Sequence, residues 1–119
     1  MLFSKLLIAG LIGSVASPVA MAANAFNTQV SYITTGPLVA ATADRMYLGV
    51  TTDLTTLSPA TPACNTQRRY VIQITTDVGE AVLSMLEEAQ AAGRAIDVVG
   101  TANCSFDSTS EGVAWVVVH

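Results

Sequence analysis

The chain has 119 residues, of which 51% are hydrophobic and 12% charged, and its formal net charge is −4. The first 22 residues have one charged side chain, Lys5. The rest of the chain contains four arginines and nine aspartates and glutamates, which gives it a net charge of −5. Binding to nucleic acid or to an anionic membrane surface depends on clustered Lys and Arg, so this balance argues against both partners. The remaining length suffices for one domain.

The N-terminal stretch has the features of a secretory signal peptide. Lys5 supplies a positive start, an apolar run follows over residues 6–15, and Ala20-Met21-Ala22 places small residues where signal peptidase cuts. The run is about half as long as the roughly 20 residues that a membrane span needs. We expect residues 1–22 to be removed by cleavage after Ala22, with cleavage after Ala23 as the next choice. Residues 23–119 would then form one exported domain, periplasmic or secreted, without membrane insertion.

Three strands are expected in the first half of this domain. The first covers Thr28–Thr35 and the second Arg45–Thr52, where Met46, Leu48 and Val50 alternate with an outward-facing Tyr47. A segment rich in Thr, Ser and Pro then leads to Cys64 and predicts an irregular loop. The third strand covers Arg69–Thr75 and directs Tyr70, Ile72 and Ile74 to the core.

A helix is expected from Asp77 to Ala92, because Thr76 is a suitable N-cap and Gly93 a suitable C-terminal glycine. The helical period leaves Leu83 off the inner face, as a candidate contact residue. The residues predicted to face the core are Val78, Val82, Met85, Leu86 and Ala89.

Two strands close the chain, at Ala95–Thr101 and Gly112–Val118, with a polar loop between them. The last strand is apolar on both faces and therefore needs cover on both sides. Trp115 alternates in phase with Val113 and Val117, which predicts a place in the core or in a subunit interface. The candidate residues for an oligomer interface are Leu83, Trp115, Val116 and Val118.

The order β-β-β-α-β-β predicts an OB-fold, a small, partly open Greek-key barrel with its helix between the third and fourth strands. A split antiparallel sheet with the helix across one face is the alternative. Cys64 and Cys104, an even pair in an exported chain, are expected to form a disulfide. Their spacing fits no zinc site, and His119 is the only histidine, so no metal, cofactor or catalytic residue is expected and the protein is not predicted to be an enzyme.

The segment CNTQRRYVIQITTDVGEAVLSMLEEAQAAGRAIDVVGTANC resembles the core signature of the subtilase cytotoxin B subunit and of exported proteins similar to it. In that pattern a Cys precedes a strand, a Thr-capped helix follows, and the next strand ends in Gly-Thr-x-x-Cys. The resemblance implies an OB-fold, a Cys64–Cys104 disulfide and a ring of five subunits. Such rings bind host glycans and associate with a separate enzymatic A subunit.

Two functions follow as expectations. The first is an exported, non-enzymatic module that binds a glycan as a homopentamer, with Tyr47 as the candidate ligand-binding aromatic. The alternative is a periplasmic structural or protein-interaction protein on the same fold, without sugar binding. The glycan contacts of the family are not transferred, because the start NAFNTQ lacks the matching acid-and-serine pattern.

Overall fold

The structure is a computed structural model, and it describes residues 22–38 and 43–119. Residues 1–21 lie outside the described part, and with them almost all of the expected signal peptide. That segment therefore stays a prediction.

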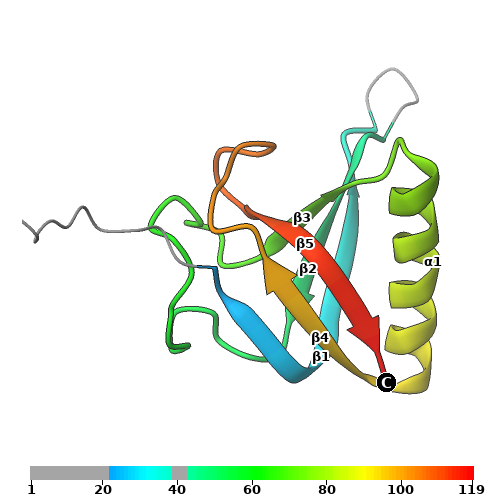
Figure 1. Ribbon diagram of the computed structural model, residues 1–119. Coiled ribbons are helices and arrows are strands. Elements are labelled where there is room, and N and C mark those ends of the chain that lie inside the picture. The colour runs from blue at the N-terminus through cyan, green and yellow to red at the C-terminus, as the bar shows by residue number, and fades with distance from the viewer. Residues whose placement is uncertain (1–21, 39–42) are drawn as a thin grey trace, which may run out of the picture.

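Five strands and one helix follow one another in the predicted order (Figure 1). They are β1 (Asn24–Gly36), β2 (Arg45–Val50), β3 (Tyr70–Gln73), α1 (Asp77–Ala92), β4 (Ala95–Gly100) and β5 (Glu111–Val118). The strands pair in the order β1-β2-β3-β5-β4, and β4 pairs back with the first half of β1, so the pairings form a ring. The protein is thus mainly β, with one helix and one five-stranded sheet.

The sheet is mixed, because one of its pairs is parallel. β3 and β5 run in the same direction and pair through Tyr70 with Glu111 and Val71 with Gly112. The other four pairs are antiparallel. This parallel pair distinguishes the structure from the wholly antiparallel split sheet that the sequence left as an alternative.

β1 begins four residues earlier than predicted and is bulged. Its first part pairs with β4 and its second part with β2, and the register shifts between Ala25 and Thr28 and again between Val30 and Tyr32. At the first shift Asn27 has a φ of 53°, a left-handed conformation that asparagine tolerates better than most residues. The bulge breaks the alternation of apolar and polar residues, so the start of β1 carried no recognisable strand pattern.

The core lies inside the ring of strands and beneath α1. Tyr70 and Ile74 are buried as predicted, and Ile72 is partly buried against the same cluster. Met46 and Leu48 of β2 are also completely buried, which confirms the inner face predicted for this strand. The other large contributors are Leu54, Leu86, Ile96 and Val98.

The boundaries predicted for the helix are confirmed. The Thr76 hydroxyl accepts a hydrogen bond of 3.0 Å from the backbone N–H of Gly79, and Gly93 adopts a left-handed conformation with a φ of 66°. Both are standard ways to begin and end a helix. Within the described ranges, no helix is long and apolar enough to cross a membrane.

The face that α1 turns to the core agrees with the prediction at Val82, Leu86 and Ala89 and differs from it elsewhere. Gly79, Leu86 and Ala89 are buried and Leu83 is partly buried, whereas Val78 and Met85, predicted to face inward, are exposed. The reason is the close approach of the helix to the end of β3 at Gly79, where an added Cβ would lie 2.0 Å from the Gln73 carbonyl oxygen. This contact turns the helix so that Val78 and Met85 reach the surface, while Val82 and Leu83 pack against the core.

Candidate functional site

A groove of about 730 Å³ lies between the first half of α1, β3 and β5, with the β4–β5 loop at one end. Figure 1 shows α1 standing beside β5. Among residues 22–38 and 43–119, no charged side chain lines the groove. Its apolar lining includes Ile72, Val78, Val82, Met85, Phe106, Val113 and Trp115, and its polar lining Gln73, Thr76, Thr101, Asn103 and Ser105.

Trp115 is the largest side chain of this groove, and 62% of its surface is exposed. Of the two places predicted for Trp115, the core is therefore wrong, and the subunit interface stays a prediction. The β4–β5 register shifts between Val99, which pairs with Trp115, and Gly100, which pairs with Val113. The extra residue, Ala114, reverses the alternation, so that Val113 packs against the core and Trp115 faces outward.

The remaining predicted interface residues lie on the inner side of the fold. Leu83 on α1, and Val116 and Val118 on β5, are partly buried and pack against the core. Val117, on the outer side of β5 with Trp115, is exposed. The alternation within the last four residues of β5 thus gives one inner and one outer face, rather than two equally exposed apolar faces.

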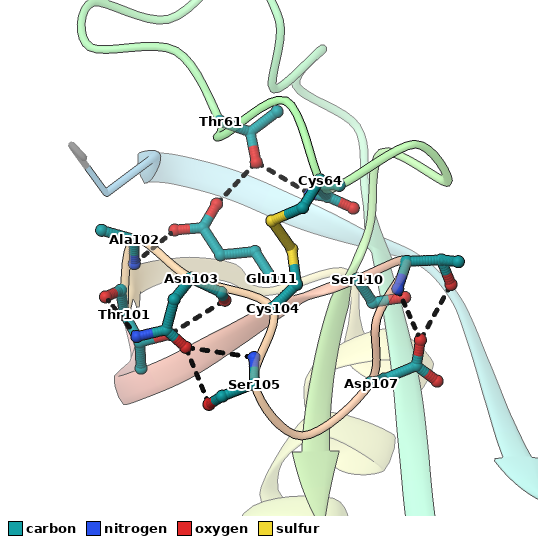
Figure 2. The surroundings of a disulfide bond; sticks show 12 residues. Thr61, Cys64, Thr101, Ala102, Asn103, Cys104, Ser105, Asp107, Ser110 and Glu111 are labelled. Carbon is teal, nitrogen blue, oxygen red and sulfur yellow. Dashed lines mark hydrogen bonds between the residues drawn. A yellow bond between two sulfur atoms is a disulfide. The ribbon is translucent and has the colours of Figure 1, made fainter. Parts of the chain in front are cut away.

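The polar end of the groove is held by the predicted disulfide, which the structure confirms between Cys64 and Cys104 (Figure 2). Asn103 and Ser105, on either side of Cys104, both line the groove. The Asn103 side-chain oxygen accepts hydrogen bonds from the Ser105 backbone N–H, at 3.2 Å, and from its hydroxyl, at 2.9 Å. The bridge ties this loop to the irregular segment that precedes β3, so it fixes the rim of the groove.

Tyr47 lies outside the groove, on the outer side of β2, in a cluster that joins β2 to the β4–β5 loop. Its hydroxyl donates a hydrogen bond of 2.5 Å to Asp107, and the Arg69 guanidinium lies 3.7 Å from the centre of its ring. Arg69 also donates to the Ser110 hydroxyl at 2.8 Å. The hydroxyl and one face of Tyr47 are thus occupied by the protein itself and are not free for the ligand that the sequence suggested.

Asp107 is the electrostatic centre of this cluster. Its carboxylate accepts from Arg45 at 3.2 Å and from the Thr109 backbone N–H at 2.9 Å, besides Tyr47. Burial by itself would raise the pKa of Asp107, but the hydrogen bonds from Tyr47, Thr109 and Arg45 together lower it well below its usual range. Arg45 also lies over the ring of Phe106, at 4.7 Å from its centre, and Phe106 lines the groove. The cluster therefore supports one wall of the groove.

The Asp107→Asn variant is expected to lose stability in a pH-dependent manner. The pKa of Asp107 is lower in the folded chain than the value of about 3.9 for an unfolded aspartate. Its stabilising contribution is therefore fully present above about pH 4 and lost as the pH falls further. Urea unfolding should show a clear difference between wild type and variant at about pH 6 that shrinks toward about pH 2. Glu87→Gln, on the exposed side of α1, is the control, and a pH-independent difference for Asp107→Asn would contradict this assignment.

The described residues do not form a metal centre. Across residues 22–38 and 43–119, no three His, Cys, Asp or Glu side chains lie close enough to hold a metal ion. His119 is placed 2.9 Å from Asp97, which also accepts a hydrogen bond of 2.7 Å from the Asn27 backbone N–H. Both contacts belong to the exposed side of β4, away from the groove.

Comparison with known protein families, curated proteins and solved structures gave no match. The candidate site therefore rests on its own geometry. Sequence reasoning missed the exposure of Val78, Met85 and Trp115 and the place of Phe106, because each depends on a bulge, a helix rotation or a loop contact. The presence of a single Trp in a chain poor in aromatics was the one sequence signal that pointed to this residue.

Proposed function

We propose that this protein is an exported, non-enzymatic binding module and that the groove beside Trp115 holds a neutral glycan. The observation that carries the proposal is a largely exposed tryptophan in a groove with polar amides and hydroxyls at one end and, in the described part of the chain, no charged side chain. Binding sites for small molecules commonly combine an apolar and aromatic wall with a few polar groups. An indole face can stack against the C–H face of a sugar ring, while Gln73, Asn103 and Ser105 offer hydrogen bonds to its hydroxyls.

The strand order supports assignment of the domain to the OB-fold. A ring of five pairings with β3 parallel to β5, and a helix between β3 and β4, is the arrangement expected of that fold. The resemblance to toxin B subunits points to the same fold and to a glycan as ligand. OB-folds commonly bind oligosaccharides and oligonucleotides, and the acidic net charge favours the sugar.

Export of the chain is supported by two independent features. The disulfide is of a kind that persists in the periplasm or outside the cell. The N-terminal sequence has the charge, apolar run and small residues of a signal peptide. Together they favour a domain that begins at Ala23 and acts in the periplasm or as a secreted protein.

Substitution of Trp115 tests the ligand site. We expect the wild-type protein to bind neutral glycans on an array and Trp115→Ala to reduce these signals at least tenfold, because stacking on the indole is lost. The matched control is Phe26→Ala, since Phe26 is as exposed as Trp115, at 62%, but lies on β1 outside the groove. Equal signals for wild type and Trp115→Ala, or no signal from the wild type, would contradict the proposed site.

A homo-oligomer, with a pentamer as the form implied by the resemblance, is the second candidate for this surface. Val78 is 73% exposed and Met85 38%, and both lie beside Trp115 along the groove. β3 pairs with β5 only at Glu111 and Gly112, so the rest of that edge of β5 has no strand partner among the described residues. Such an edge can pair with a neighbouring subunit.

Light scattering distinguishes a subunit interface from a glycan site on this surface. A mass of several chains for the wild type, reduced to that of one chain by Met85→Glu, is the result expected of an oligomer. If the wild type has the mass of one chain at micromolar concentration, the oligomer is excluded. If Trp115→Ala also dissociates the protein, the groove belongs to the subunit interface, which favours the protein-interaction alternative over the glycan site.

A further inference from the structure

The side chain of Glu111, at the start of β5, is completely buried and all of its hydrogen-bond partners are neutral. One carboxylate oxygen accepts a hydrogen bond of 2.6 Å from the Thr61 hydroxyl. The other accepts from the backbone N–H groups of Ala102, at 3.1 Å, and Ala23, at 3.2 Å. Figure 2 shows the carboxylate between Thr61 and Ala102.

The fold makes room for this carboxylate, but the described residues provide no positively charged partner for it. A Cβ on Gly100 would lie 2.0 Å from one carboxylate oxygen, so glycine is needed opposite Glu111. Among the described residues, no Arg or His forms a salt bridge with Glu111. A buried charge without a partner of opposite sign is costly, which raises the question of what neutralises it.

Ala23 is held in place at both ends of its backbone. It is completely buried; its N–H donates to Glu111, and its carbonyl oxygen accepts a hydrogen bond of 2.7 Å from the buried Tyr70 hydroxyl. The residue before it, Ala22, is only partly buried. The next residue, Asn24, carries a buried amide oxygen that has no hydrogen-bond partner in the described part of the chain. The nitrogen of Ala23 is thus held against the buried Glu111 carboxylate.

We propose that Glu111 is the receptor for the α-ammonium group that cleavage after Ala22 creates on Ala23. Water is consumed, the C–N bond between the two alanines breaks, and Ala22 retains a carboxylate while Ala23 gains a protonated amine. The nitrogen then carries a positive charge at neutral pH and more hydrogens than an amide. The inference rests on the proposed export of the chain, in which cleavage precedes folding and therefore does not require access to the buried residue.

The proposal fixes the processing position, which the sequence left open between Ala22 and Ala23. Cleavage after Ala23 would remove both the ammonium group at this position and the carbonyl that Tyr70 binds. We expect mass spectrometry of the protein purified after expression of the full chain in an exporting bacterial host to show Ala23 as the first residue. A mature protein that begins at Asn24 would overturn the proposal but not export, whereas an unprocessed chain would overturn the export on which it rests.

The ion pair itself can be tested because Lys5 is the only lysine of the chain. The α-amine is therefore the single aliphatic amine of the processed protein. Acetylated with an active ester in urea and then refolded, the protein should have a folding equilibrium constant at least tenfold lower than the untreated protein, since the charge opposite Glu111 is removed. In the Glu111→Gln variant the same acetylation should change this constant less than threefold.

One further measurement keeps the test decisive if Glu111→Gln does not fold. The native protein should react with the ester at least tenfold more slowly than a variant with Gly-Ser inserted between Ala22 and Ala23, whose new terminus lies outside the site. Equal reaction rates, or equal stability of the acetylated and free proteins, would overturn the proposal. If the host does not process the chain, the same measurements are made on residues 23–119 released from a fusion, since all buried core residues of the described structure lie in that range.

Discussion

Replacement of both Cys64 and Cys104 by alanine is expected to lower the free energy of unfolding by about 4 kcal/mol. The bridge joins residues 40 apart in sequence, and the loop that it closes contains β3, α1 and the whole of β4. In the unfolded chain this closure removes a large part of the conformational freedom. For a domain of this size, whose total stability is on the order of 5–15 kcal/mol, the loss is severe.

The irregular segment before β3 makes the effect larger than the entropy of the loop alone. Residues 51–69 contain no strand or helix, yet they contribute the buried Leu54 and the Thr61 hydroxyl that contacts Glu111. Without the bridge to Cys104, this segment is held by the buried Leu54 and by hydrogen bonds at Thr51, Thr52, Thr61 and Gln67, so we expect it to open locally before global unfolding.

Urea unfolding of the oxidised protein and of the double variant measures the effect. The reduced wild-type protein is the matched control, since it removes the bond without any change of sequence, and it should unfold at nearly the same urea concentration as the variant. A loss below about 1 kcal/mol in both forms would show that the bridge does not stabilise the fold. Glycan binding should weaken in parallel, because Asn103 and Ser105 flank Cys104 at the rim of the groove.

Gly79→Ala is expected to destabilise the protein by roughly 2 kcal/mol, although alanine is the better helix former. An exposed Gly→Ala change within a helix stabilises by about 1 kcal/mol. Here the new Cβ would lie 2.0 Å from the Gln73 carbonyl oxygen and 2.9 Å from the Cα of Ile74. These are backbone atoms that move only if α1 and the end of β3 separate, and such overpacking costs about 1–3 kcal/mol or more.

The control for this variant is Gly36→Ala, because an added Cβ at Gly36 meets no atom within 4 Å. We expect Gly36→Ala to change the midpoint of urea unfolding little and Gly79→Ala to lower it clearly. An increase in stability for Gly79→Ala would contradict the close contact between helix and strand. Without that contact, the explanation given above for the outward position of Val78 and Met85 would also be lost.

The sequence contained enough local information to predict every element and the order of the elements. Thr76 and Gly93 defined the two ends of α1, and the alternation of Met46, Leu48 and Val50 identified β2. The disulfide followed from an even pair of cysteines in a chain whose start has the features of a signal peptide. These features depend on local chemistry, which a single sequence records directly.

The surface could not be predicted, because it depends on shifts in register and on contacts between distant residues. The extra residue in β5 turned Trp115 outward, and the contact at Gly79 turned Met85 outward. The pairing of the Tyr47 hydroxyl with Asp107 joins residues 60 apart in sequence, and the contact of Ala23 with Glu111 joins residues 88 apart. No periodicity within one segment indicates such pairs.

The fluorescence of Trp115 tests the proposed function most directly, because this residue is the only tryptophan of the chain and lies in the groove. Titration with a neutral glycan that is positive on the array should change its emission in a saturable manner, and the change should persist in Phe26→Ala. Without ligand, the emission should stay the same when the protein concentration is changed, because a groove that is open to ligand is not covered by a second chain. If no glycan changes the emission but dilution of the protein shifts it, the glycan site is contradicted and the groove is assigned to contacts between protein chains.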